Sequence, residues 1–597
     1  MAMVFRPDGD AKQRSGSLMA KRLLTESKQA TSESATPSEH AATSRGNFVA
    51  RLSKRALIGA LAFLLFLYLP YRGFLHWTRI SPPPEAGLGV PRPAVQMQGL
   101  REYAGRSWSS HERGLWEYHL EGDPFSLGYT HSRLGTRSLM DTERYMFDEM
   151  HRYVPSQLAL FMIRLGVLLK YRNLPTLIDP ILRLELAGVA EGQPDLFGDF
   201  LPMYHRVVFY HALHDITQTL ENSPMLGCTA LAAAGKASRD GHVYVGRNFD
   251  FEGPPMFDKE KAILFFKPQG KLPFASVAWP GMIGVVTGIN TAGIFVSVNA
   301  LRSEDKSPGG VPVELLLREV LEQARSLDEA IDLIKRRPVL VPDLYLIADG
   351  HSGETAVVER SPTRAEVRRS RDILAVANHA LTPAFASDKE SQRLRDYLTS
   401  GARQARADEL LQNQSGKVDA SIMLQLLRDK RGVGDKPLSL GNRNALDALI
   451  ATHSVVVDAT EMIIWVGVGP HALGRYVGFD LRRELLDEPR PQPADLAEDP
   501  TLYSQEYQAY LQAGRAMEAA KAMRSAGRLD LALTEAARAV ALMPTSPELR
   551  FEYAELLHLH KTPQSLALMR EQLTTFLTLS PPHRKDIEYA QALLTAP

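Results

Sequence analysis

Short strand-like runs separated by turns dominate the chain from Cys228 to about residue 470. Runs such as "GIFVSVNA", "DLYLIAD" and "ETAVVER" are rich in β-branched and aromatic residues, and Gly, Asn or Asp bound them. Two helical stretches interrupt the runs, over 311–337 and over about 387–427, and Ser326 with Glu329 predicts a capping box in the first. Antiparallel hairpins with helices grouped outside them predict an α+β layered fold.

The sequence on either side of this region is mostly helical. Residues 100–227 contain long amphipathic runs such as "DTERYMFDEMHRYVPSQLALFMIRLGVLLKY", and residues 500–597 read as consecutive helices. Small residues at helical spacing let two helices of this tail pack closely: Ala532, Ala536 and Ala539. The separation of Pro544 and Pro581 approaches the period of about 34 residues found in tetratricopeptide repeats, which the tail resembles. A plain helical bundle is the alternative.

The N-terminal part predicts a membrane anchor. Residues 1–50 are rich in Ser, Thr and Ala without lasting periodicity, so we expect them to be disordered. The run 56–71 carries no charge, although it is slightly shorter than the usual span of about 18 residues, and basic residues precede it. We therefore expect a single-pass signal-anchor helix over 55–74, with the N-terminus in the cytoplasm and the catalytic domain outside. A Pro-rich linker over 75–99 would follow; a buried core helix or a cleaved signal are the alternatives.

Composition excludes several classes of function. Lys+Arg and Asp+Glu are both 69, so no basic excess exists to neutralise the phosphates of a nucleic acid. Cys228 is the single cysteine, which excludes an intrachain disulfide and a multi-cysteine metal site. No cofactor or metal is expected.

Cys228 is the candidate nucleophile, and its base is the open question. A free thiol has a pKa of about 8.5 and needs a base or a positive neighbour to become the reactive thiolate. His379 or His453 would supply the base in a Cys–His thiol hydrolase that does not cleave itself. If the Gly227–Cys228 bond breaks, the new α-amine of Cys228, with a pKa of about 7.7–8.0, becomes the base instead.

Several segments resemble a known group of enzymes. "GCTALAAAGKASRDGHVYVGRNFDF", "WPGMIGVVTGINTAGIFVSVNA", "LAVANH", "HSVVVDATEMIIWVGVGP" and "LELAGVAEGQ" resemble the N-terminal-nucleophile (Ntn) hydrolases, in the isopenicillin-N acyltransferase-like and choloylglycine hydrolase families. The resemblance covers about 100–475. It implies an αββα sandwich with a pre-nucleophile segment over 100–227 and a catalytic part over 228–490. It also implies self-cleavage before Cys228, and hydrolysis or acyl transfer at a linear amide of a small molecule through an acyl-thioester. An inactive domain serving as a protein-binding scaffold, with a partner on the C-terminal repeats, is a third interpretation.

The resemblance assigns catalytic roles to five residues: Cys228, Arg247, Asp250, Asn299 and Asn378. Cys228 supplies the nucleophile and, through its amine, the base. Arg247 and Asp250 match an Arg-x-x-Asp pair near the sulfur and the amine, with a surface ion pair as the alternative. Asn299 matches an oxyanion-binding asparagine and Asn378 a second asparagine of the site, with strand-ending turns as the alternative. A later site arginine is left open between Arg393 and Arg395.

The turn after Cys228 predicts how these groups meet. A two-residue turn at Asp240–Gly241 would leave Asp250 about 10 Å along the strand from Cys228. A five-residue loop over 237–241 instead pairs Cys228 with Asp250, and Arg247 with Leu231. We expect the longer loop, a bulge or strand end near residue 248, and the Asp250 carboxylate within hydrogen-bonding reach of the Cys228 nitrogen.

Overall fold

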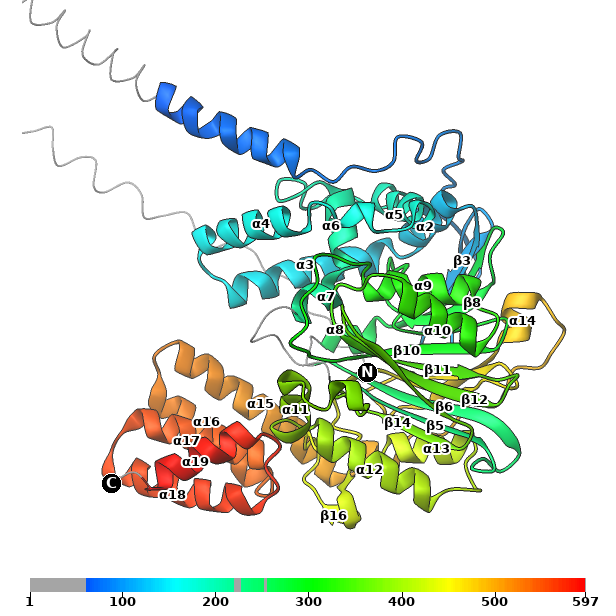
Figure 1. The fold of residues 1–597 in the computed structure, drawn as a ribbon. Helices are drawn as coiled ribbons and strands as arrows, with labels where there is room; N and C mark the ends of the chain where they lie inside the picture. The colour runs from blue at the N-terminus through cyan, green and yellow to red at the C-terminus, as the bar shows by residue number, and fades with distance from the viewer. Residues whose placement is uncertain (1–60, 219–226, 252–254, 596–597) are drawn as a thin grey trace, which may run out of the picture. The chain divides into compact units, whose positions relative to one another are not determined.

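The computed structural model describes residues 61–218, 227–251 and 255–595 (Figure 1). It divides into two compact units, Met1–Trp77 and Thr78–Pro597. In the first unit, residues 61–77 form a helix whose large apolar side chains are exposed: Leu61, Phe63, Leu64, Leu65, Phe66, Leu67, Tyr68, Leu69 and Trp77. The expected disordered segment 1–50 and the start of the expected anchor lie outside the described residues.

Within the described residues, no single helix is long and apolar enough to cross a bilayer, and one bent pair, Thr136–Arg152 with Gln157–Thr176, meets the length and composition requirement. Within the expected linker, Thr78 and Ile80 at the start of the second unit are buried.

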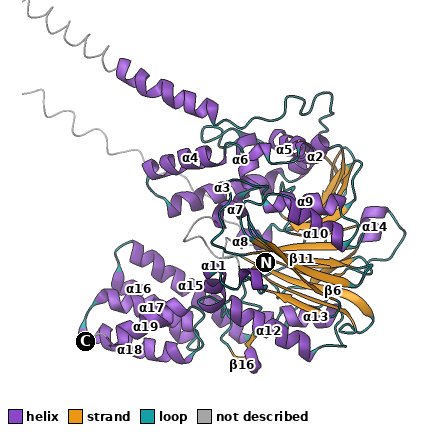
Figure 2. Cartoon of the chain, in the orientation of Figure 1, coloured by secondary structure: helices purple, strands orange, loops and turns teal. Residues whose placement is uncertain are grey.

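The described part of the second unit contains two large sheets and one small one (Figure 2). The eleven-stranded sheet has the order β1 (Gln96–Gln98), β2 (Arg101–Ala104), β3 (Ser107–Ser110), β4 (Trp116–Gly122), β7 (Ala262–Pro268), β8 (Phe274–Ala278), β9 (Thr287–Asn290), β10 (Ile294–Ala300), β11 (Asp343–Asp349), β12 (Glu354–Arg360) and β13 (Ala365–Ser370). The six-stranded sheet has the order β14 (Ile373–Val376), β5 (Thr229–Gly235), β6 (Gly241–Asp250), β17 (Ala451–Asp458), β18 (Ile463–Gly467) and β19 (Tyr476–Asp480). A short pair joins β15 (Arg431–Gly432) to β16 (Lys436–Pro437). Pairing in the two large sheets is antiparallel except between β4 and β7.

The helices of the second unit fall into four groups along the chain. Before Cys228 lie α2 (Pro124–Leu134), α3 (Thr136–Tyr153), α4 (Gln157–Tyr171), η1 (Leu174–Thr176), α5 (Pro180–Gly192), α6 (Met203–Tyr210) and α7 (Leu213–Gln218). After it come α8 (Pro255–Lys259), α9 (Val313–Gln323) and α10 (Leu327–Arg336). Then follow η2 (Pro383–Phe385), α11 (Lys389–Asp396), α12 (Ser400–Asn413), α13 (Ala420–Leu427), η3 (Val433–Asp435) and α14 (Leu481–Leu486). The tail holds η4 (Pro500–Tyr503), α15 (Gln505–Ser525), α16 (Leu529–Leu542), α17 (Pro547–His560), α18 (Pro563–Thr578) and α19 (Arg584–Thr595).

The two large sheets pack face to face with helices outside, so the expected layered arrangement is present. Along β5, Ala230 and Ala232 enter the core between the sheets, while Leu231 and Ala233 pack against α12 and α13 on the other face. This strand is buried on both sides, which explains its continuous apolar sequence. On the outer face of the eleven-stranded sheet, α9 contacts β9 and β10, and α10 contacts β11 and β12.

Two element predictions need correction. The mostly helical segment 100–227 contains β2, β3 and β4 before α2, and these strands extend the eleven-stranded sheet. The run "GMIGVVTG" becomes a strand only from Thr287. The capping interaction at α10 is present in altered form: the Glu329 N–H donates to Ser326 Oγ (3.3 Å), while the Glu329 carboxylate accepts from the Arg325 N–H (2.7 Å).

The tail is helical, and it shares a core with residues 440–473 of the preceding region. Ala532, Ala536 and Ala539 are fully buried, which confirms the close packing expected from small residues. The same cluster includes Leu440, Leu449 and Leu473 from outside the tail. The tetratricopeptide assignment stays a prediction.

Candidate active site

The hairpin formed by β5 and β6 places Cys228 beside the end of a neighbouring strand. Gly235 pairs with Gly241, so a five-residue loop over 236–240 connects β5 to β6, as expected, and the alternative two-residue turn is not formed. This loop starts one residue earlier than predicted, and an irregularity between Ala233 and Gly235 shifts the register by one. Arg247 consequently pairs with Ala230 instead of Leu231. The expected bulge lies on the neighbouring strand β17, between Ala451 and His453.

Arg247 is the charged group nearest the sulfur among the described contacts. Its Nη2 lies 3.8 Å from Cys228 Sγ, and both residues are fully buried. The guanidinium also donates to the carbonyl oxygens of Val286 and Val298 and to the Thr287 hydroxyl, which fix its position. Burial raises the pKa of the Cys228 thiol, and the charge of Arg247 opposes that shift.

Arg403 on α12 completes the surroundings of the nucleophile, and sequence reasoning missed it. Its Nη1 donates to the carbonyl oxygen of Cys228 (2.6 Å) and to Thr229 Oγ1 (2.7 Å), and its Nη2 donates to Asn378 Oδ1 (2.8 Å). Of the two arginines considered, Arg395 forms an exposed ion pair with Asp396. Arg393 lines a cavity instead. Arg403 shares α12 with Arg406, and no local signal distinguishes the two.

The two predicted asparagines, Asn299 and Asn378, link the eleven-stranded sheet to the six-stranded sheet. Asn299, near the end of β10, donates through Nδ2 to the carbonyl oxygens of Val376 (3.1 Å) and Ala377 (2.8 Å). Asn378, just beyond β14, donates through Nδ2 to the carbonyl oxygen of Ala300 (2.9 Å). Both amide groups therefore hold β14 against β10. Asn299 Oδ1 is buried and has no hydrogen-bond partner within the described residues.

Asp250 contacts the nucleophile segment through its backbone. Its carbonyl oxygen accepts a hydrogen bond from the Gly227 N–H (3.0 Å). The predicted bond between its carboxylate and the Cys228 nitrogen is not among the described hydrogen bonds. Burial raises the pKa of this carboxyl to about 7, and the nearby charge of Arg403 limits the rise.

The two candidate histidines are engaged with other groups. His453 Nε2 lies 2.9 Å from Thr287 Oγ1, and His379 Nδ1 lies 2.7 Å from Ser400 Oγ. Burial lowers the pKa of His379 to about 4 and that of His453 well below its usual value. Neither ring is hydrogen-bonded to the thiol among the described contacts, so the Cys–His arrangement is not formed in this part of the structure.

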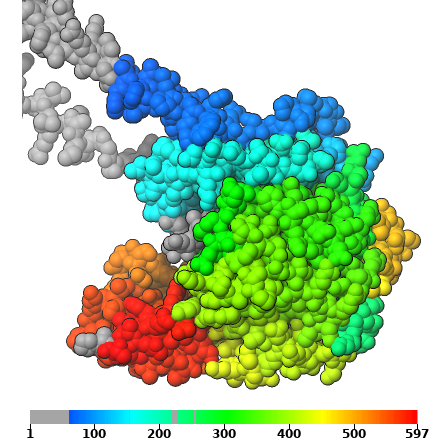
Figure 3. All heavy atoms as spheres, in the orientation of Figure 1, coloured from blue at the N-terminus to red at the C-terminus, as the bar shows by residue number. Residues whose placement is uncertain are grey.

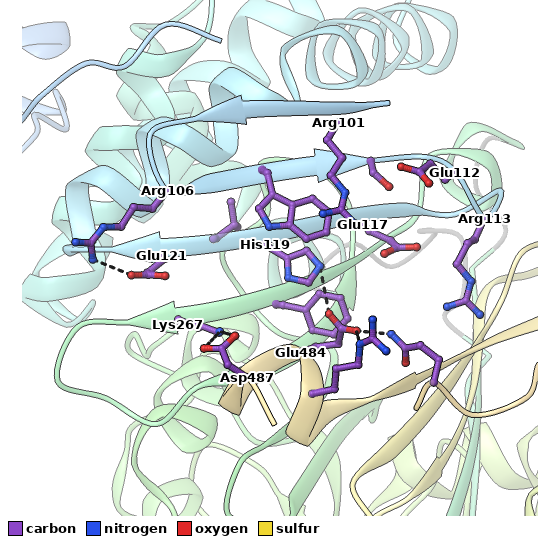
Figure 4. A pocket seen from close by; sticks show the side chains of 16 residues that line it. Arg101, Arg106, Glu112, Arg113, Glu117, His119, Glu121, Lys267, Glu484 and Asp487 are labelled. Carbon is purple, nitrogen blue, oxygen red and sulfur yellow. Dashed lines mark hydrogen bonds and ion pairs between the residues drawn. The ribbon is translucent and has the colours of Figure 1, made fainter. Parts of the chain in front are cut away.

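Of the cavities in the described part of the second unit, two large ones are lined by very different residues. A cavity of about 980 Å³ is lined by 170–174, Leu177, 301–309 and 340–342, and it reaches Leu301, two residues after Asn299. A second cavity of about 580 Å³ lies between β2–β4 and α14, where His119 of β4 lies 3.7 Å from the carboxylate of Glu484 on α14 (Figure 4). The five predicted catalytic residues are absent from its described lining.

Known proteins resemble this region of the chain. Residues 237–466 match the family described as acyl-coenzyme A:6-aminopenicillanic acid acyl-transferase. An uncharacterized protein of Archaeoglobus fulgidus is 27% identical over 309 residues, which cover 46% of this chain and 51% of that protein. The N-acylethanolamine-hydrolyzing acid amidase of Mus musculus is 28% identical over 142 residues, which cover 22% of this chain and 37% of the amidase. The acyl-coenzyme A:6-aminopenicillanic-acid-acyltransferase 40 kDa form of Emericella nidulans is 24% identical over 310 residues, covering 51% of this chain and 79% of that form.

The match to the first two relatives thus spans about half of their length or less. The matched segment nevertheless contains most of the predicted site residues, from Arg247 and Asp250 to Asn299 and Asn378. The region from residue 237 to residue 466 is therefore similar to the acyl-coenzyme A:6-aminopenicillanic acid acyl-transferases, as the resemblance to the Ntn hydrolases of the choloylglycine hydrolase-like group predicts.

Proposed function

We propose that this protein is an autoprocessed cysteine Ntn hydrolase that cleaves a linear amide, or transfers its acyl group, through an acyl-thioester on Cys228. The observation that carries the proposal is the position of Cys228, directly after Gly227 and between two buried guanidinium groups. Arg247 lies at its sulfur and Arg403 at its carbonyl oxygen. The relatives named as an amidase and an acyltransferase support this class of reaction.

Self-cleavage begins with attack of Cys228 Sγ on the carbonyl carbon of Gly227. The peptide nitrogen leaves as the α-amine of Cys228 and takes up a proton, which leaves Gly227 attached to the sulfur as a thioester. Water then hydrolyses the thioester, releasing a Gly227 carboxylate and the free thiol. The charge of Arg247 favours the attacking thiolate, which counteracts the effect of burial.

Turnover uses the amine that cleavage creates. The α-amine accepts the thiol proton, the sulfur attacks the carbonyl carbon of the substrate amide, and the amine of the substrate leaves after protonation. Water captures the acyl-thioester in hydrolysis, and a second amine captures it in acyl transfer. We assign stabilisation of the oxyanion to Asn299. Its Nδ2 donates to two carbonyl oxygens here, so donation to an oxyanion requires at least one of these bonds to change.

We also propose that the apolar segment over 55–74 anchors the enzyme, with the second unit outside the cytoplasmic membrane. The exposed apolar side chains of residues 61–77 support this assignment. The C-terminal helices would then be available to a protein partner in the same compartment.

Mass spectrometry and N-terminal sequencing of the purified full-length chain test the proposal. We expect a fragment that starts at Cys228 and release of the amine from chromogenic N-acyl amides of varied chain length. Adding a primary amine and measuring new amide product separates transfer from hydrolysis. Turnover by a chain whose Gly227–Cys228 bond is intact would favour the Cys–His mechanism, and cleavage without any turnover would favour the scaffold interpretation.

A further inference from the structure

Helix α4 carries its apolar surface on the outside of the second unit. Leu160, Leu168 and Tyr171 face inward and are buried. The residues at the spacing of the opposite face are also apolar: Leu158, Phe161, Met162, Leu165 and Leu169. Leu158 is 71% exposed and Met162 is 58% exposed. Figure 3 shows this segment, in cyan, at the surface of the molecule.

Such a helix differs from the usual surface helix, whose exposed side is polar. A contiguous exposed apolar stripe marks a site of contact with a protein or a membrane. The few polar residues of α4 include Lys170, which is exposed at the C-terminal end of the stripe. A cation at this position suits lipid phosphate groups at the edge of a buried apolar face.

The chain enters the second unit close to α4. Thr78 is buried directly after the apolar helix over 61–77. Arg79 and Arg164 of α4 both lie near enough to His205 of α6 for their charges to lower its pKa, which burial brings to about 4. The rings of Tyr171 on α4 and Phe209 on α6 are also in contact, with centroids 6.4 Å apart. Arg79, at the start of the second unit, and helix α4 therefore both lie beside α6.

We propose that α4 docks on a lipid bilayer, with its outer face among the acyl chains and Lys170 at the headgroups. The helix has 15 residues and is about 22 Å long, so it is too short to span a hydrocarbon core of about 30 Å and lies along the interface. This inference goes beyond the proposed chemistry and rests on the anchor assigned above for the commitment to a bilayer. Docking in this way places the end of the 980 Å³ cavity formed by Lys170 and Tyr171 at the membrane surface.

Fluorescence quenching in the full-length chain tests the docking. In a Cys228→Ala background, Met162→Cys carries a single environment-sensitive fluorophore on α4. Leu559→Cys, on an exposed apolar residue of α17, is the matched control, and Leu65→Cys reports on the anchor. Each labelled protein is reconstituted in phosphatidylcholine–phosphatidylserine vesicles that contain either nitroxide-labelled lipid or aqueous iodide as quencher.

We expect nitroxide lipid to quench the label at 162 several-fold more than the label at 559, and iodide to show the reverse. Adding Leu158→Glu and Leu169→Glu should abolish the lipid quenching at 162 without changing the thermal unfolding midpoint, because both positions are exposed. A label at 162 that behaves as the label at 559 overturns the proposal. Shielding from both quenchers also overturns it, because a protein then covers α4. The label at 65 shows separately whether the anchor is in the bilayer.

Discussion

Arg403 donates a hydrogen bond of 2.6 Å to the carbonyl oxygen of Cys228 from a helix on the outer face of the six-stranded sheet. Arg247 reaches the sulfur of the same cysteine from within the sheet and also binds carbonyl oxygens of the facing sheet. Cys228 is thus held at its backbone by a helix of one layer and at its side chain by a strand of another. Such rigid placement suits the proposed attack of Cys228 on the peptide bond that precedes it.

Replacing Arg403 should slow self-cleavage strongly. Alanine removes donors to three buried acceptors, and lysine cannot reproduce the planar fork that reaches them together. A lost hydrogen bond to a charged group is worth about 1.5–3 kcal/mol, so we expect about a 10- to 100-fold slower appearance of the Cys228 fragment on denaturing gels. Arg395→Ala is the matched control, since its exposed ion pair contributes little. Cleavage of Arg403→Ala at the wild-type rate would falsify this role.

The chemistry at position 228 depends on a nucleophilic side chain. We expect Cys228→Ala to remain one chain and to hydrolyse no amide, because it has no group to attack Gly227. Cys228→Ser should cleave, but more slowly, because an uncharged hydroxyl is a weaker nucleophile than a thiolate. The rate of self-cleavage of both variants is measured from the time course of fragment formation after refolding. Full-rate amide turnover by the uncleaved alanine variant is the result that would contradict the prediction.

The pKa of Asp250 predicts how stability depends on pH. An unfolded aspartate titrates near pH 4, whereas burial raises the pKa of Asp250 to about 7 in the folded protein. Between these values the folded state holds a proton that the unfolded state has lost. The contribution of Asp250 to the free energy of unfolding is therefore greatest below about pH 4 and declines as the pH rises to about 7.

Urea unfolding in a Cys228→Ala background measures this effect. Relative to its parent, Asp250→Asn should gain free energy of unfolding steadily from pH 4 to pH 7, because it cannot ionise. Asp396→Asn is a suitable control, since its ion pair with Arg395 lowers the pKa of Asp396 and gives no decline over this range. A constant difference between Asp250→Asn and its parent would contradict the assignment.

Local patterns predicted most elements correctly but not the contacts between them. The runs at β11 and β12 have the boundaries expected from their sequences, because each has an apolar centre flanked by charged residues and turns. The strands β2–β4 were missed, since their polar residues give no strand pattern and β4 joins them to the sheet by pairing with the distant strand β7. The hairpin register differed by one residue, because an irregularity near Ala234 cannot be read from residue types. Arg403 was missed for the same reason: its role comes from the packing of α12 against β5.

The last prediction separates a structural from a chemical role for Asn299. Its Nδ2 holds the carbonyl oxygens of Val376 and Ala377, so alanine leaves two buried acceptors unpaired. We expect Asn299→Ala to lower the free energy of unfolding of the Cys228→Ala chain by about 1–3 kcal/mol, as measured with urea. Asn378→Ala, which frees the carbonyl oxygen of Ala300, is the matched variant on the other sheet.

In processed enzyme the two variants should differ. If Asn299 also stabilises the oxyanion, its alanine variant loses about 100-fold in kcat with little change in KM, because the lost interaction exists only in the transition state. Asn378→Ala, whose Oδ1 accepts from Arg403, should instead act through the position of that guanidinium and slow self-cleavage along with turnover. Equal losses of kcat in the two variants, matched to equal losses of stability, would show that Asn299 acts only by holding β14 against β10.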